Sequence, residues 1–417
     1  MSTHQKPSHC ALPYFPVEGN QLMVGGLPIE QLAQQIGSTP FYAYDRAVID
    51  QRIRMLRETL PSPIKLHYAV KANPMPALVQ HVATQVDGLD IASKGELTLT
   101  LQTATDPRHI SFTGPGKGED ELQAAINAGV TLNIESATEM RRIADVAEEL
   151  GVRPRITLRV NPDFELKSSG MRMGGGASPF GTDAERIPEL LATLASLDLE
   201  FLGFHIFAGS QNLHAEAIIE AQNATFKLAI QLAEHAPSPV RLLNMGGGFG
   251  IPYFPGDKPL EIAPVADNLQ SLCDQTAQAL PEAELALELG RYLVGEAGVY
   301  VCRVIDKKVS RGETFLITDG GLHHHLAATG NFGQVIRKNY PVVIGNKIAG
   351  NNLSKVKTEV VNIVGRLCTP LDLLAARVEL PTAEIGDLVV ILQSGAYGRS
   401  ASPKDFLSHP PAQERLV

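Results

Sequence analysis

A single lysine gives the first indication of chemistry in this chain. Lys71 ends the apolar run LHYAVK and is followed by Ala-Asn-Pro, a combination that interrupts regular structure. A lysine in such a place is more often a surface residue. At the end of a buried strand, however, its amine would enter a pocket, where it could form a Schiff base with an aldehyde.

Two further motifs supply an anion site and an acid. The stretch NMGGGFG contains Gly246, Gly247 and Gly248. Such a run lets backbone N–H groups approach an anion closely, although a sharp turn is its commoner explanation. The stretch ELGRYLVG contains Glu288 and Arg291. An amine, a phosphate-binding glycine loop and an acid in one pocket would together form a site for pyridoxal 5'-phosphate (PLP).

These residues form one site only if the fold brings them together. From residue 64 to about 295, apolar runs alternate eight times with segments of helical spacing: IKLHYAV, GLDIAS, HISFT, VTLNI, RITLRVN, FLGFHIF, VRLLNM and ELALEL. Continuous apolar runs are typical of parallel strands buried on both faces, and eight repeats close a (β/α)8 TIM barrel. An open doubly wound sheet is the alternative, but it seldom has so many repeats. One intervening segment begins with Ser136 and has Glu139 three residues later, as in a capping box.

A barrel would gather the reactive groups at one rim, because functional residues lie at the carboxyl ends of its strands. The first predicted strand ends at Lys71. The glycine run follows the seventh strand, where barrels often bind phosphate, and Glu288 ends the eighth. The second and sixth strands add four more candidates for the cofactor pocket: Asp90, His205, Phe207 and Ser210.

A second domain follows the predicted barrel. After residue 298 the runs VYVCRVIDKKVS, TFLITDGG, KTEVVNIVG and GDLVVILQSGAYG are rich in β-formers and lack long helices between them, which predicts an antiparallel β domain. We therefore expect an N-terminal segment (1–45) that joins the β domain, a PLP-binding barrel (46–295) and a C-terminal β-rich domain (296–417).

With these residues in place, the sequence resembles PLP enzymes of the alanine-racemase fold, and among them the diaminopimelate and ornithine decarboxylases. YAVKAN resembles the family's lysine motif, DIASKGE its second-strand motif, GGGFG its phosphate loop, and ELGRYLV its Glu-Pro-Gly-Arg motif with leucine in place of proline. The resemblance implies that Lys71 carries PLP, that Asp90 lies near it, and that Ser210 and Arg291 assist the phosphate loop.

The same resemblance implies roles for residues in the C-terminal domain. LCTPLDLL occupies the place of the family's Cys-Glu-Ser motif, and SGAYGRS that of its tyrosine motif. Cys368 would then reach across a homodimer interface into the partner's active site and donate a proton, and Tyr397 would help hold the phosphate. The alternative for Cys368 is a buried apolar thiol.

Glu288 bears on the type of reaction. In the family this acid faces the pyridine nitrogen, where a carboxylate stabilises the protonated ring. A protonated ring best accepts the electrons left when CO2 departs, so we expect a carboxy-lyase. An amino-acid racemase of the same fold would be expected to place an arginine there. A non-catalytic PLP-binding protein of the single-barrel type would lack the C-terminal β domain.

Departures from the family pattern bear on the substrate. Thr369 replaces the acid that follows the cysteine in ornithine and diaminopimelate enzymes, and a hydroxyl cannot give the charge-assisted hydrogen bond that a distal ammonium requires. Phe207 replaces a histidine that stacks on the ring. The chain resembles a divergent branch that includes decarboxylases of carrier-bound glutamate and enzymes of exosortase loci. We therefore expect a substrate with a neutral or tethered far end; diaminopimelate is the alternative. Arg337 could meet a substrate carboxylate, although a solvated basic patch is the commoner explanation.

Composition excludes several other classes. A net charge of -9 without a long basic run argues against nucleic acid as a partner. The four scattered cysteines suit a reducing compartment, and the chain shows neither a signal-peptide pattern nor an apolar stretch of membrane-spanning length. We expect a cytoplasmic enzyme. The run His323–His325 lacks metal-ligand spacing, so we expect no metal.

Overall fold

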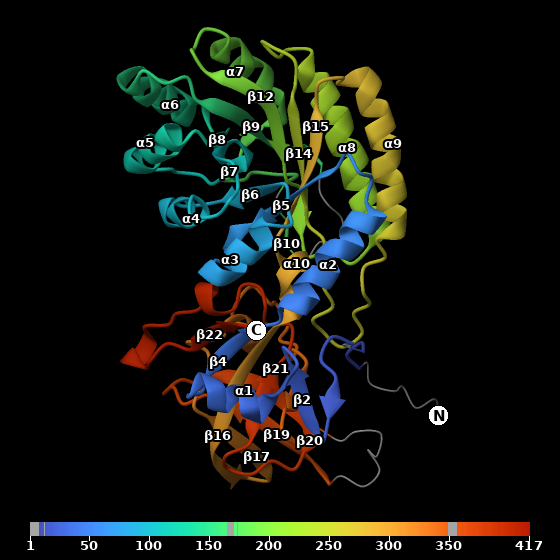
Figure 1. Ribbon diagram of the computed structural model, residues 1–417, viewed down its shortest axis with the longest axis vertical. Coiled ribbons are helices and arrows are strands. Elements are labelled where there is room, and N and C mark those ends of the chain that lie inside the picture. Colours follow the sequence, from blue (N-terminus) through green and yellow to red (C-terminus); the bar gives the residue numbers. More distant parts are fainter. Residues whose placement is uncertain (1–7, 12, 165–170, 173, 349–356) are drawn as a thin grey trace. The chain divides into compact units, whose positions relative to one another are not determined.

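The computed structural model describes residues 8–11, 13–164, 171–172, 174–348 and 357–417. The chain divides into two compact units, whose elements are labelled in Figure 1. The barrel unit comprises Arg52–Ile251 and Pro259–Leu293, and the β unit comprises Met1–Gln51, Pro252–Lys258 and Val294–Val417.

The barrel unit contains a closed ring of eight parallel strands. In ring order they are β5 (Lys65–Ala69), β6 (Gly88–Ile91), β7 (Ile110–Phe112), β8 (Thr131–Ile134), β9 (Arg155–Asn161), β12 (Glu200–Ile206), β14 (Leu242–Gly247) and β15 (Glu284–Leu289), which pairs with β5. The pairing of β8 with β9 completes the ring. The predicted barrel is therefore confirmed, and each predicted run overlaps its strand.

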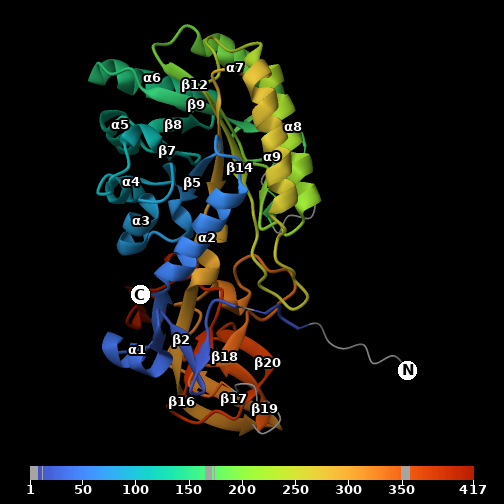
Figure 2. The same cartoon turned by 45° about the vertical axis from the view of Figure 1, so that its right-hand side comes forward.

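Helices cover the outside of the ring, as Figures 1 and 2 show for α3–α9. They are α3 (Pro76–Ala83), α4 (Lys94–Thr100), α5 (Glu119–Ala128), α6 (Ala137–Leu150), α7 (Ile187–Leu194), α8 (Ala215–Ala233) and α9 (Ala263–Ala279). The short α10 (Arg291–Val294) follows β15, and α2 (Arg46–Thr59) precedes β5. Three two-residue strands lie near the carboxyl end of the ring: β10 (Met171–Arg172), β11 (Thr182–Asp183) and β13 (Gly209–Ser210).

The capping box predicted at the start of α6 is present in part. Ser136 caps the helix by accepting a hydrogen bond from the Glu139 amide (3.1 Å), as expected. The carboxylate of Glu139, however, accepts from the amide of Glu135 (2.7 Å) and from the buried amine of Lys117 (3.0 Å). The serine half of the predicted capping box is therefore confirmed. The glutamate half is not, because the Glu139 carboxylate instead binds the buried Lys117 ammonium, which requires a partner of opposite charge.

The β unit is built on a sheet in the order β18 (Val342–Ile344), β21 (Leu388–Ile391), β16 (Gly298–Ser310), β17 (Glu313–Thr318), β19 (Thr358–Val364) and β20 (Leu373–Pro381). Strand β4 (Phe41–Tyr44) pairs with β16 and with β22 (Gln413–Leu416). Most pairs are antiparallel, as predicted, but β17–β19 and β4–β22 are parallel, so the sheet is mixed.

A small N-terminal subregion completes the β unit. Strands β1 (Val17–Glu18), β2 (Gln21–Val24) and β3 (Leu27–Pro28) form a three-stranded sheet that precedes α1 (Ile29–Ile36). Apolar side chains of α1 and β4 share one buried cluster with residues of β16 and β21. No helix in the described part of the chain is long and apolar enough to cross a membrane.

Candidate active site

Lys71 lies in a short 3-10 turn (Val70–Ala72) directly after β5. The turn is fixed by the residues behind it: the Tyr68 hydroxyl donates to the carbonyl of Asn73 (2.9 Å), and the Asn73 amide donates to the carbonyl of Val70 (3.0 Å). Val70 and Ala72 are buried, whereas the Lys71 side chain is 46% exposed. The strand exit therefore presents the lysine amine and buries its neighbours.

The amine of Lys71 meets the buried carboxylate of Glu288. Nζ lies 3.2 Å from Oε1, and the Glu288 side chain is only 3% exposed. Gly290 permits this approach, because a Cβ at that position would lie 2.8 Å from the Cβ of Ala72. Glycine after β15 thus lets the turn of Lys71 pack against the end of the strand that carries the acid.

A histidine holds the other oxygen of the same carboxylate. Nε2 of His205, on β12, lies 3.1 Å from Oε2 of Glu288. The side-chain amide of Asn133 lies 3.5 Å from Nδ1 of His205 and donates to it, which places the ring proton on Nε2, facing Glu288. Asn133 is itself held by the hydroxyls of Thr113 and Thr157. A buried polar network therefore orients the acid.

The electrostatic environment keeps Glu288 ionised. Burial by itself would raise the pKa of this carboxyl, but the Lys71 ammonium, the hydrogen bond from His205 and the charge of Arg159 hold it well below the ordinary value for glutamate. A carboxylate in this state can stabilise a positive charge placed beside it.

The glycine run packs closely against the residues of this site. A Cβ on Gly246, whose φ is 66°, would lie 2.5 Å from the ring of Phe207, and a Cβ on Gly247 would lie 2.3 Å from the carbonyl oxygen of Glu288. The Lys71 amine lies 5.8 Å from the centre of the Phe207 ring. Close packing therefore accounts for glycine at 246 and 247, and the anion-binding role of the run stays a prediction.

Three further candidates of the barrel unit have other neighbours. Asp90 on β6 is buried; it accepts a hydrogen bond from the hydroxyl of Ser111, and its Oδ2 lies 3.5 Å from Nδ1 of His67. Ser210 belongs to β13, which pairs with β10, and Arg291 is the first residue of α10. Their roles at the cofactor stay predictions.

In the β unit, Cys368 is exposed on the turn between β19 and β20, so its alternative as a buried thiol is wrong. Asp372, which the sequence analysis missed, fixes this turn. Its carboxylate accepts from the amides of Leu367 (2.8 Å) and Leu322 (2.6 Å). Burial raises the pKa of Asp372. The only sequence signal was an aspartate after the Thr-Pro-Leu of the same motif.

The remaining candidates of the β unit are held by local contacts. Thr369 accepts a hydrogen bond from the amide of Leu371 (3.3 Å). Arg337 donates from Nε to the carbonyl of Thr329 (3.1 Å) and from Nη2 to the carbonyl of Leu373 (2.6 Å). Tyr397 has a φ of 52° and stacks at 6.5 Å on Phe332. The substrate role of Arg337 and the phosphate role of Tyr397 stay predictions.

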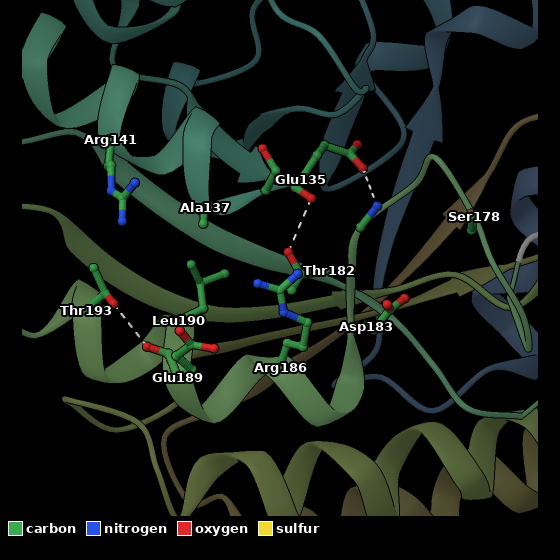
Figure 3. Close-up of a pocket in the computed structure, with 12 residues that line it drawn as sticks. Glu135, Ala137, Arg141, Ser178, Thr182, Asp183, Arg186, Glu189, Leu190 and Thr193 are labelled. Atoms are coloured by element: carbon green, nitrogen blue, oxygen red, sulfur yellow. Dashed lines mark hydrogen bonds between the residues drawn. The ribbon is translucent and has the colours of Figure 1, made fainter.

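A separate pocket of about 200 Å³ opens where β8 and β9 end (Figure 3). Glu135 stands at its inner side and accepts from the amide of Gly181 (2.7 Å) and from Arg159 (2.8 Å). Burial would raise the pKa of Glu135, but Arg159 lowers it. Arg141 and Arg186 extend from α6 and from the turn before α7 on different sides of the pocket, and both are exposed.

Comparison with known proteins matches this architecture to one family. A family model described as "Pyridoxal-dependent decarboxylase, pyridoxal binding domain" matches residues 46–295. The chain is 37% identical over 384 residues to L-glutamyl-[BtrI acyl-carrier protein] decarboxylase of Niallia circulans, covering 91% of this chain and 88% of that protein. It is 31% identical over 408 residues to diaminopimelate decarboxylase of Aquifex aeolicus, covering 97% and 92%.

A solved structure agrees with these matches. The crystal structure of diaminopimelate decarboxylase from Helicobacter pylori complexed with L-lysine superposes with a TM-score of 0.81 at 27% identity, covering 93% of this chain and 94% of that chain. The residues at the rim fit the cofactor that the family name implies. They offer a partly exposed primary amine, an aromatic face near it, and a buried carboxylate that is held ionised for a cationic ring.

Proposed function

The chain belongs to the family of pyridoxal-dependent decarboxylases, and on this premise we propose that its substrate is a glutamyl group tethered to an acyl-carrier protein, or a similar α-amino acid with a neutral far end. The family makes the protein a PLP-dependent amino-acid carboxy-lyase. The 37% identical relative decarboxylates a carrier-bound glutamyl group. The observation that carries the choice of substrate is Thr369, a neutral residue in the exposed turn of Cys368.

The residues of the barrel unit support the chemistry of decarboxylation. When bound, PLP supplies an aldehyde for a lysine amine and a ring that accepts the electrons left by CO2. Lys71 would hold the cofactor covalently. Glu288, kept ionised, would hold a proton on the ring nitrogen, and His205 would keep the carboxylate in place through its 3.1 Å contact. The face of Phe207 would lie against the ring.

We further propose that the protein acts as a homodimer with shared active sites. Cys368 of one chain would project into the active site of the partner chain. There it would give a proton to the carbon that has lost CO2. Its exposure supports this role, because a proton donor for another chain must stand at the surface. Asp372 would act as a positioning residue, since its carboxylate holds both sides of the turn.

Release of CO2 by the purified enzyme with PLP tests the substrate. We expect release from a glutamyl-carrier and little from free L-glutamate, which has the same amino acid without the tether. Lysine, ornithine, arginine and diaminopimelate complete the set. Faster turnover of free diaminopimelate than of the glutamyl-carrier would overturn the proposal and leave diaminopimelate decarboxylase as the function.

A pair of variants tests Thr369 directly. Thr369→Asp restores an acid beside Cys368 and is expected to raise turnover of diaminopimelate relative to the glutamyl-carrier by about tenfold, the effect of one charge-assisted hydrogen bond. Leu371→Asp adds the same charge to an exposed position of the same turn and is expected to leave the ratio unchanged. Equal ratios in the two variants would remove Thr369 as a determinant of specificity.

A further inference from the structure

A second cavity of the barrel unit, of about 460 Å³, opens at the end of the strands opposite to Lys71. Its lining includes the first residues of five strands: Ile110, Thr131, Arg155, Leu242 and Glu284. Lys71 and the Glu288 carboxylate, by contrast, lie at the carboxyl ends. The cavity volume falls in the range of about 300–1,000 Å³ that is typical of small-molecule sites.

Buried polar side chains line this cavity where apolar packing would be expected of a closed barrel. His67, on β5, is 8% exposed, and Ser111 and Thr131 are also buried. Nδ1 of the His67 ring faces Oδ2 of Asp90 at 3.5 Å, and its Nε2 makes no hydrogen bond within the described residues. Gly88 provides the room for the ring, because a Cβ there would lie 2.7 Å from Nε2. The sequence thus keeps space and a buried imidazole at this end.

The surroundings of His67 favour the charged form of its ring. Burial lowers the pKa of the imidazole, but the neighbouring carboxylates, Asp90 foremost, outweigh burial and raise it above its ordinary value. An imidazole that lines a cavity and makes no hydrogen bond at Nε2 within the described part of the chain can donate from this nitrogen to a ligand oxygen.

Three arginines line the same cavity, and one of them has no carboxylate partner in the described structure. Arg108 is paired with Asp106 (2.6 Å), and Arg241 with Glu200 (2.9 Å). Arg155 donates to the carbonyl of Arg108 (2.8 Å) and to no acid. Burial lowers the pKa of Arg155, and the charges of Arg108 and Arg241 add to this effect, although the nearby carboxylates of Glu200 and Asp106 partly offset it. An anion beside Arg155 would offset both the cost of burying its charge and the repulsion by the other two arginines.

Acidic side chains also line the cavity, which limits the ligand. They are Glu282 and Glu284, and Glu284 lies 3.7 Å from Lys65. A second anionic group at the other end of the ligand would be repelled by these carboxylates, whereas a neutral or cationic group would not. The charges of the cavity therefore suit a ligand with a single anionic group.

We propose that this cavity is a second binding site, separate from the site of Lys71, for a small molecule that carries one carboxylate or phosphate group. Arg155 and His67 bind the anionic group, and the rest of the ligand lies toward Glu282 and Glu284. The site is independent of the substrate proposed above, because none of its lining residues belongs to the rim that carries Lys71 and the Glu288 carboxylate.

Isothermal titration calorimetry on the PLP-loaded enzyme tests the site with three probes. Inorganic phosphate tests a phosphate source. Gamma-butyrobetaine tests a carboxylate source, and its quaternary ammonium cannot react with an aldehyde. Glutarate has a second carboxylate in place of the ammonium. We expect one site per chain for phosphate or for the betaine, and weaker binding of glutarate. Absence of binding by phosphate and by the betaine at about 10 mM, a free energy near -2.7 kcal/mol, overturns the proposal.

Matched variants test whether the measured heat of binding comes from this cavity. Arg155→Gln is expected to weaken binding at least tenfold, while Arg186→Gln, an exposed arginine of the pocket in Figure 3, is expected to bind as the wild type does. Binding that persists unchanged in Arg155→Gln belongs elsewhere and overturns the proposal. A crystal structure of the wild type with the bound probe gives the same decision without a variant: density beside Arg155 supports the site, and density only beside Lys71 overturns it.

Discussion

Oε2 of Glu288 lies 3.1 Å from Nε2 of His205, a residue that is 83 positions away in the chain and 1% exposed. The other oxygen of the same carboxylate lies 3.2 Å from the amine of Lys71. One buried acid therefore connects the lysine that would carry the cofactor to a polar network inside the barrel. The charge of that acid depends on both partners, and this dependence leads to the first predictions.

Glu288→Gln removes the charge but keeps the shape of the side chain. We expect kcat/KM to fall at least 100-fold, about 2.7 kcal/mol, because an amide cannot stabilise a protonated ring nitrogen. Steady-state CO2 release measures the loss. Glu261→Gln, at an exposed position of the same unit, serves as the control and should match the wild type. Wild-type activity in Glu288→Gln would remove the acid from the mechanism.

His205 acts through Glu288, and its test is a pH profile. His205→Phe removes the donor while burial still raises the pKa of Glu288, so the carboxylate takes up a proton at higher pH. The acid limb of kcat should move to higher pH by roughly one unit. His205→Gln retains a donor and should move the limb less. Identical acid limbs in the two variants would show that the contact is only structural.

Lys71→Ala should abolish covalent retention of the cofactor. After reduction with borohydride and unfolding, the wild-type chain should keep the pyridoxyl group and the variant should lose it, because no amine remains at this place. Lys94→Ala, which removes an exposed amine paired with Asp120, should retain the group. Retention in Lys71→Ala would move the attachment to another lysine.

Mixing two inactive variants tests whether Cys368 serves a neighbouring chain. Lys71→Ala and Cys368→Ala homodimers, mixed and allowed to exchange, should recover about a quarter of wild-type activity, because half of the dimers are mixed and each mixed dimer has one complete site. If Cys368 instead serves the site of its own chain, each chain of the mixed dimer still lacks either Lys71 or Cys368. Neither site is then complete, and activity should not return.

The burial of His325 leads us to expect that the stability of the folded protein depends on pH. Its ring is fully buried, accepts from the amide of Ala328 (3.3 Å) and contacts the hydroxyl of Ser394 (2.9 Å). Burial lowers the pKa of His325 to about 3. In the unfolded chain this histidine takes up a proton near pH 6.5, whereas in the folded chain it does so only near pH 3. The free energy of unfolding therefore falls as pH drops from about 6.5 toward 3, by up to about 1.4 kcal/mol per pH unit.

The melting temperature of a variant pair checks this dependence. His325→Gln should lose less stability between pH 7 and pH 5 than the wild type does, because it has no imidazole to protonate, even though its melting temperature at pH 7 is lower. His235→Gln, at an exposed position, should keep the wild-type slope. Equal slopes in all three proteins would show that His325 does not govern the acid limb of stability.

The residues of the site differ in how far the sequence could place them. Lys71 lies in the turn directly after β5 and Glu288 is the next-to-last residue of β15, so the strand pattern and the barrel rule together predicted that they share a rim. The contact between His205 and Glu288 could not be predicted, because it depends on the width of the ring and on rotamers set by Asn133, Thr113 and Thr157. Asp372 was missed for a similar reason, since its partners Leu322 and Leu367 lie far apart in the chain.

The sequence by itself determined the eight buried strands of the barrel and the presence of a β-rich unit after it. Apolar periodicity is a local property, and a parallel strand buried on both faces has to be continuously apolar. Only the tertiary structure decided the parallel pairing of β17 with β19, the exposure of Cys368 and the polar cavity at the amino ends of the strands. These features depend on which distant segments become neighbours, and close packing fixes that choice only when the whole chain is folded.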